Sequence, residues 1–146
     1  MRITELLRHK GSTVATVSGS ATVTELVAAL AEHNVGALVV TDGDAIAGIV
    51  SERDVVRHLN TVGAALLSAP VSDIMTTTVV TCAPTDSVDS LAATMTERRI
   101  RHMPVVSNDG TDDKLVGIVS IGDVVKSRIE QLETDREQLQ SYIAQG

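Results

Sequence analysis

The apolar residues of the chain follow helical spacing in some stretches and form short continuous runs in others. Val23, Leu26 and Leu30 recur at the spacing of one helix face. The run Ala37–Thr41 is almost wholly apolar, which is typical of a strand buried on both faces. These patterns predict strand, helix, strand, strand and helix in the first half, at residues 14–17, 22–34, 37–41, 45–50 and 51–58.

The second half of the chain repeats this order. Helical spacing returns at Val88, Leu91 and Met95, and a buried run returns at Met103–Val106. Thr78–Thr81 corresponds to the first strand of the first half. Self-similarity at a fixed period is the mark of a duplicated supersecondary unit, so we predict two incomplete halves that bury their apolar faces against each other. Only the turn between the last two strands is longer, at residues 108–113.

Further helices are predicted outside the repeats. Ile3, Leu6 and Leu7 stand at helical spacing and predict a short lead-in helix, and another apolar helix is expected at residues 62–67 before Pro70. The predicted division is a lead-in helix at 1–12, a first domain at 13–70, a second domain at 71–130 that begins with a linker at 71–77, and a helical extension at 131–146.

The end of the chain predicts a long helix. From Ile121 to Gln145 apolar residues recur at steps of three and four, and a continuous helix of this length spans about 37 Å. We expect this helix to dock against a second copy of the protein. The alternative is a solvated tail helix, which Arg136 at a core position favours. The repeating apolar positions are Val125, Ile129, Leu132, Leu139 and Ile143.

Composition excludes several classes of function. Tyr142 is the only aromatic residue, and the net charge is −7 with no dense basic run. Nucleic acid is therefore not an expected partner, because base stacking and phosphate-backbone binding both lack their usual residues. Cys82 is the only cysteine, which rules out an intramolecular disulfide. No stretch approaches the roughly 18 apolar residues of a spanning helix, so we expect no membrane partner and a cytoplasmic location.

One seven-residue phrase occurs twice, at Gly48–Asp54 (GIVSERD) and at Gly117–Asp123 (GIVSIGD). Each copy predicts the end of an apolar strand, then a serine that caps the next helix, and an aspartate in that helix's first turn. Such a helix start attracts anions, and a carboxylate beside it can accept hydrogen bonds from a sugar diol. The two copies therefore indicate nucleotide sites. The alternative is a pair of carboxylates that only offset helix dipoles.

Two more motifs accompany these signatures, Asp73–Thr77 (DIMTT) and Ile100–Val106 (IRHMPVV). Together the four motifs resemble the tandem cystathionine-β-synthase (CBS) domain pair, also called a Bateman module, over about residues 3–130. The resemblance implies an α/β fold in which two β-α-β-β-α repeats pack through their sheets about a pseudo-two-fold axis, with a long C-terminal helix added. It also implies two clefts for adenosine-containing ligands, a homodimer, and a free-standing module that regulates an unidentified protein.

The resemblance assigns a role to each matching residue. Asp54 and Asp123 would bind ribose hydroxyls, one in each cleft, and Ser51 and Ser120 would contact ribose or phosphate at the helix starts. The adenine would lie against apolar side chains and be read by backbone groups of the first strands. The apolar residues are Val39, Ile49, Met103, Pro104 and Ile118, and the backbone groups are those of Thr16 and Thr81.

The resemblance further implies that phosphates meet basic residues of the opposite half. These would be Arg101 and His102 in the Asp54 cleft, and Arg53 in the Asp123 cleft. The basic residues do not follow the duplication, because glycine or alanine stands at each equivalent position of the other half. Since arginine makes bidentate, charge-assisted bonds to phosphate, we expect the Asp54 cleft to hold phosphate more strongly. Alternatively, Arg101 and His102 are ordinary polar residues at a strand edge.

These features predict a non-catalytic sensor whose ligand is AMP, ADP, ATP or NAD(H). S-adenosylmethionine fits less well, because basic groups at the phosphate end favour a phosphorylated ligand. The rivals are an interaction module without a ligand and, with the least support, an enzyme acting on an adenine nucleotide. No catalytic residue, catalytic cofactor or metal is predicted, because the histidines lack ligand spacing and Cys82 has no nearby base in the sequence.

Overall fold

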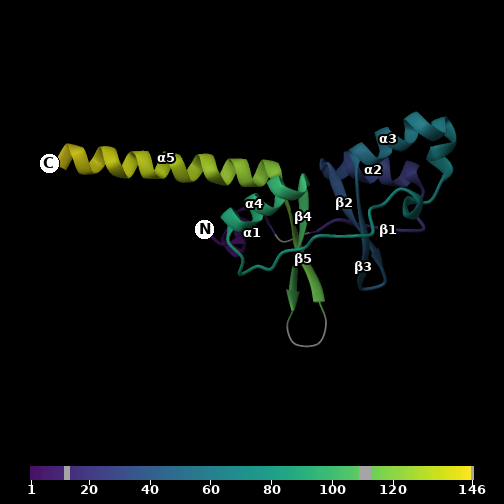
Figure 1. Ribbon diagram of the computed structural model, residues 1–146, viewed down its shortest axis with the longest axis horizontal. Helices are drawn as coiled ribbons and strands as arrows, with labels where there is room; N and C mark the ends of the chain where they lie inside the picture. The colour runs from purple at the N-terminus through teal and green to yellow at the C-terminus, as the bar shows by residue number, and fades with distance from the viewer. Residues whose placement is uncertain (12–13, 109–112, 146) are drawn as a thin grey trace.

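The structure is a computed structural model that describes residues 1–11, 14–108 and 113–145. The strands lie between the helices of the first half and those of the second (Figure 1). The first half contains β1 (Thr16–Ser18), α2 (Val23–His33), β2 (Ala37–Asp42), β3 (Ala45–Ser51) and α3 (Glu52–Val62). The second half contains α4 (Val88–Arg98), β4 (His102–Asn108), β5 (Asp113–Ser120) and α5 (Ile121–Gln145). The connecting elements are α1 (Ile3–Lys10) and the 3-10 helices η1 (Gly63–Ser68) and η2 (Val71–Asp73).

The last two strands of each half pair in the same way. β2 pairs antiparallel with β3, and β4 pairs antiparallel with β5, each with one register shift, at Val40/Thr41 and at Val105/Val106. β1 adds to β2 as a parallel third strand. A shared irregularity at corresponding places supports the predicted duplication. The longer turn predicted at residues 108–113 lies mostly outside the described residues.

The strand predicted at Thr78–Thr81 does not form. Only Cys82 pairs with β4, where the Cys82 amide donates to the Pro104 carbonyl at 3.0 Å in a parallel bridge to Val105. The segment before this strand position is bound to the first half, because Thr76 exchanges two backbone hydrogen bonds with Ile49, at 2.9 and 3.0 Å. The chain must then cross to the second half, which leaves one residue for pairing with β4.

The helices begin at the predicted caps. The Thr22 hydroxyl accepts from the Glu25 amide at 3.1 Å at the start of α2, and Ser51 forms a capping box with Asp54 at the start of α3. The apolar helix predicted at residues 62–67 is a 3-10 helix instead, because Gly63 ends α3 with a left-handed φ of 78°. None of the described helices is long and apolar enough to cross a lipid bilayer.

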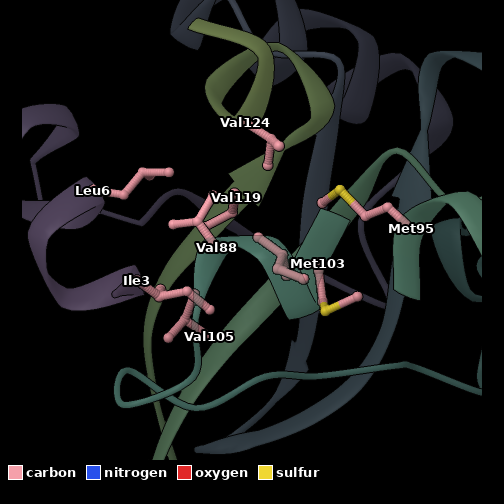
Figure 2. Packing of buried hydrophobic residues seen from close by; sticks show 9 residues of the cluster. Ile3, Leu6, Val88, Met95, Met103, Val105, Val119 and Val124 are labelled. Carbon is pink, nitrogen blue, oxygen red and sulfur yellow. The ribbon is translucent and has the colours of Figure 1, made fainter. Parts of the chain in front are cut away.

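Each half is completed by the segment that precedes the other half. Ile3 and Leu6 of α1 are buried in the core of the second half, beside Val88, Val119 and Val124 (Figure 2). In the first half, the core around α2 and β2 is closed by the linker that follows η1. The linker residues buried there are Val71 and Ile74, with Met75 packed against them.

The long C-terminal helix is present as predicted. α5 runs over Ile121–Gln145 and projects away from the body of the molecule (Figure 1). Val124 is the only buried residue that α5 contributes among the described residues, so most side chains of the helix are exposed. Its apolar positions are therefore exposed, among them Ile129 at 50% and Leu132 at 60%.

Gly48 and Gly117 occupy equivalent positions in the two halves, and together they test how the linker and α1 pack against the strands. A Cβ at Gly48 would lie 2.7 Å from the Thr76 carbonyl oxygen, whereas a Cβ at Gly117 would meet the end of the Leu7 side chain at 2.7 Å. We expect Gly48→Ala to lower the free energy of unfolding by about 2 kcal/mol, and Gly117→Ala by less than about 1 kcal/mol, because a side chain can move and the bonded linker cannot. Urea denaturation measures the free energy of unfolding of both variants. Equal losses would contradict the claim that the linker at Gly48 is held more rigidly than the Leu7 side chain at Gly117.

Candidate functional site

A cleft with a volume of about 320 Å³ lies between the two halves. One wall is the junction of β3 and α3, which carries the first signature. The opposite wall is the turn from α4 into β4, at residues 99–102, and the linker from Thr76 to Val80 runs along it. Segments that are far apart in the sequence therefore form one site. The residues of the first signature that line it are Ile49, Val50, Ser51, Glu52, Arg53 and Asp54.

Asp54 is fixed in the cleft by its own helix start. Its Oδ2 accepts hydrogen bonds from the Ser51 amide at 2.8 Å and from the Ser51 hydroxyl at 3.1 Å. The other carboxylate oxygen has no hydrogen-bond partner among the described residues. A carboxylate held by one oxygen is oriented without being saturated, so Asp54 can accept hydrogen bonds from a ligand.

The cleft is rich in arginine. Arg53, Arg57, Arg99 and Arg101 all line it, and Glu52 and Asp54 are its acidic residues. Arginine side chains bind phosphate oxygens through paired N–H groups, so their concentration suits an anionic ligand. Sequence reasoning missed Arg57 and Arg99. The position of Arg57 one helical turn after Arg53 was a usable signal, whereas nothing in the sequence places Arg99.

His102 stands between the two signatures. It lines the cleft, and burial lowers the pKa of its imidazole, as do the charges of Lys10 and Arg101; the nearby carboxylates of Asp123 and Glu52 oppose this. A histidine with a lowered pKa is neutral at pH 7 and can donate one hydrogen bond and accept another. His102 therefore adds polarity to the cleft without adding charge.

Several predicted residues lie elsewhere. Arg53 was predicted to serve the Asp123 cleft, but it lines the Asp54 cleft because it sits beside Asp54 in the first turn of α3. Val39 and Met103 are 0% and 1% exposed, so neither side chain is placed to touch adenine. Val39 lies in β2, the central strand of the three-stranded sheet, and Met103 packs in the hydrophobic core of the second half. Pro104 does line the cleft, as Ile49 does.

Thr16 and Thr81 line a different groove. This groove has a volume of about 1200 Å³ and lies against the turn between β2 and β3 and the strands β4 and β5. The residues of this segment that line the Asp54 cleft are Thr76, Thr78, Val79 and Val80. Any backbone reading of a base in that cleft therefore falls to the linker, a few residues before Thr81.

The second signature has a different environment. Its cap repeats the first, since the Ser120 amide donates to Asp123 Oδ2 at 2.8 Å and the Asp123 amide donates to Ser120 Oγ at 3.1 Å. Lys10 of α1, however, lies on the same carboxylate oxygen, with Nζ at 2.6 Å from Asp123 Oδ2 and at 2.6 Å from the Ile118 carbonyl. Burial would raise the pKa of Asp123, but hydrogen bonds from Lys10 and Ser120 outweigh it and lower the pKa.

Other reactive groups do not gather in the cleft. Burial, and after it the charge of Asp86, raises the pKa of the Cys82 thiol to about 12, so this thiol is protonated at neutral pH. Among residues 1–11, 14–108 and 113–145, no group of three or more His, Cys, Asp or Glu side chains is placed to hold a metal ion.

Comparisons with known proteins agree with the repeat and the fold. A family model for the CBS domain matches residues 9–61 and again residues 71–130. The chain is 38% identical over 130 residues to the CBS domain-containing protein CBSX3, mitochondrial, of Arabidopsis thaliana; the match covers 86% of this chain and 61% of that protein. The chain therefore spans less than two thirds of that relative's length.

Solved structures show the same architecture. The CBS-domain containing protein ATU1752 from Agrobacterium tumefaciens is 42% identical with a TM-score of 0.82, and the match covers 88% of this chain and 99% of that one. The CBS domain pair of protein MJ0100, solved with 5′-methylthioadenosine and S-adenosyl-L-methionine, is 21% identical with a TM-score of 0.75, and covers 90% and 98%. The second likeness concerns the fold alone.

Arg99 provides a test of strain at the cleft. It ends α4 in the left-handed conformation with φ 56°, and Asn34 ends α2 in the same way with φ 53°. We expect Arg99→Asn to raise the free energy of unfolding by about 0.5–1 kcal/mol, because relief of backbone strain outweighs the loss of one exposed C-terminal charge. The mirror variant Asn34→Arg should lower it by a similar amount. Chemical denaturation measures the free energy of unfolding of both variants. A lower value for Arg99→Asn than for the wild type would contradict the claim that the Arg99 backbone is strained.

Proposed function

The chain belongs to the CBS domain family, with two copies of the domain in tandem, and on this premise we propose that it is a non-catalytic regulatory module that binds an adenine nucleotide in the Asp54 cleft. The observation that carries the proposal is the pairing of two features in one cleft. An oriented carboxylate stands at a helix start, and four arginine side chains line the same space.

The two ends of a nucleotide match these features. The ribose diol donates hydrogen bonds to the unused oxygen of Asp54. The phosphate meets Arg53 and Arg57 of α3, and Arg99 and Arg101 from the opposite wall. The N-terminus of α3 adds the positive potential of its helix dipole. Arginines from both halves thus surround one anion, and the Asp54 cleft is expected to grip phosphate strongly.

The middle of the cleft suits the base. Ile49, Pro104 and the linker valines Val79 and Val80 line it with apolar surface. The backbone of residues 78–80 passes the same space and supplies donors and acceptors for the edge of adenine. The proposal therefore differs from the roles that the resemblance implies in two ways: Val39 and Met103 are buried and do not contact the base, and residues 78–80 take the place of Thr81 in recognising it.

Charge decides among adenosyl ligands. S-adenosylmethionine, one of the two ligands in the MJ0100 complex, shares adenosine with AMP, ADP, ATP and NAD(H) but carries a positive sulfonium. Four arginines repel that charge and attract phosphate. We therefore place the phosphorylated ligands first and S-adenosylmethionine after them.

The position of the cleft between the two halves would couple ligand binding to their relative arrangement. Its walls come from both halves, so a bound nucleotide stabilises the arrangement in which Arg99 and Arg101 are close to α3. A ligand shifts such an equilibrium by its differential affinity for the two arrangements. A partner protein would read the change. In the rival case, an interaction module without a ligand, the arginines are surface charges and no adenosyl compound changes stability.

The proposal also includes a homodimer. α5 exposes apolar residues along its length, and α3 exposes Val56, Leu59 and Val62. Burial of such stripes against a second copy removes apolar surface from water. The apolar residues of α5 concerned are Val125, Ile129, Leu132, Leu139, Tyr142 and Ile143.

Thermal unfolding with AMP, ADP, ATP, NAD, NADH, adenosine and S-adenosylmethionine tests the ligand. We expect phosphorylated compounds to raise the melting temperature more than adenosine does, because a ligand stabilises the folded state that binds it. Asp54→Ala should weaken AMP binding at least about tenfold, or about 1.4 kcal/mol, and Asp123→Ala should have little effect. An equal loss in both variants, or no shift with any compound, would count against the proposal. After incubation with the protein, a sensor leaves the nucleotide unchanged, whereas an enzyme converts it to a product.

Light scattering tests the dimer. We expect a dimer at micromolar concentration and a monomer for Ile129→Glu, because a charge buried in an apolar contact is costly. Gln131→Glu adds the same charge to the same exposed helix, away from the apolar positions, and should remain dimeric. A monomeric wild type would overturn the dimer and leave the ligand proposal standing.

A further inference from the structure

The two signatures share one cap geometry but differ in what lies on the carboxylate. The serine amide donates to the aspartate Oδ2 at 2.8 Å in both copies. Among the described residues, no ion pair involves Asp54, whereas Lys10 lies 2.6 Å from Asp123. The duplication therefore preserves the two carboxylates, but the chain itself supplies a cation to one of them.

We propose that Lys10 closes the second of the two duplicated sites: its ammonium occupies the place of a ligand's ribose on Asp123, so that each chain binds one nucleotide, in the Asp54 cleft. The identity of that nucleotide rests on the proposed function. The role of Lys10 rests on the geometry at Asp123. Lys10 is thus a residue that sets the number of ligands per chain.

Lys10 is held at this position by a docked helix. Ile3 and Leu6 of α1 are buried in the core of the second half. The helix start is tied down as well, since the Ile3 amide donates to the Asp86 carbonyl and the Thr4 amide to the Pro84 carbonyl, both at 3.0 Å. The ammonium at the end of α1 is therefore tethered close to Asp123, and a tethered group competes at a high effective concentration.

The ammonium makes two bonds that a ligand would have to replace. Nζ donates to Asp123 Oδ2 and to the Ile118 carbonyl, each at 2.6 Å. In the first half the equivalent carbonyl, that of Ile49, accepts from the backbone amide of Thr76 at 2.9 Å, and no charge is involved. The pair is partly exposed, with 33% of Lys10 and 25% of Asp123 accessible, so it is screened and can be displaced at a cost.

The second signature keeps only one of the four basic positions of the first, because Lys126 stands at the place of Arg57 and the other three are not basic. Gly122 stands where α3 has Arg53, and the residues equivalent to Arg101 and His102 are Gly36 and Ala37. A nucleotide at Asp123 would therefore displace a cation without gaining arginines for its phosphate. Both differences favour occupation of the Asp54 cleft alone.

Isothermal titration with AMP tests the role of Lys10. We expect one AMP per chain for the wild type and two per chain for Lys10→Met, which keeps the apolar stem and removes the ammonium. Lys114→Met removes one exposed lysine of β5 as a matched control and should keep one AMP per chain. Two sites in the wild type, or no additional site in Lys10→Met, would overturn the inference.

The Asp54→Ala background separates this inference from the proposed function. Asp54→Ala alone should bind AMP at least about tenfold more weakly than the wild type, and Asp54→Ala with Lys10→Met should gain a tighter AMP site, which Asp123→Ala then removes. If the wild type binds no AMP but Lys10→Met binds one at Asp123, the proposed function fails and the role of Lys10 stands. If the wild type binds one AMP and Lys10→Met also binds only one, the proposed function stands and the role of Lys10 is wrong.

Discussion

Neither half of the chain completes its own core. α1 precedes the first half but packs into the second, and the linker precedes the second half but packs into the first. This exchange joins the halves into one body, because separating them exposes apolar surface on both sides. It also fixes the paths of the two connecting segments, since each must end beside a strand of the half that it completes. The properties of the two signature sites follow from what those segments carry.

The linker contacts the first signature through uncharged backbone groups, whereas α1 contacts the second signature through the ammonium group of Lys10. Thr76 forms backbone hydrogen bonds with Ile49, and among the described residues the Asp54 carboxylate has no ion-pair partner. Lys10 brings an ammonium to the matching place and neutralises Asp123. The duplicated scaffold thus has two sites that differ in charge: arginines line the cleft that holds Asp54, whereas Lys10 forms an ion pair with Asp123. In our proposal this asymmetry leaves one nucleotide site per chain.

Patterns local in the sequence predicted much of this. The duplication, the caps at Thr22 and Ser51, and the long α5 all depend on nearby residues, and each was predicted from spacing. Arg101 and His102 line the same cleft as the first signature, although they come from the opposite half, and their roles in binding stay predictions. The resemblance to the CBS domain pair supplied those predictions.

Contacts between distant segments were not predictable in the same way. Lys10 and Asp123 are separated by most of the chain, and no local pattern marks their pairing. The missing strand at residues 78–81 reflects the crossing of the linker, which overrides the β-propensity of its valines. Val39 and Met103 fit the motif of an adenine wall, but alternation along a strand does not reveal which face a neighbouring half will cover.

A crystal structure of the protein grown with AMP tests the central claim most directly. The account predicts one AMP per chain, with the ribose hydroxyls on Asp54, the phosphate among the arginines of the cleft, and Lys10 still bonded to Asp123. AMP bound at Asp123 with Lys10 displaced, or an empty Asp54 cleft at saturating AMP, would contradict it.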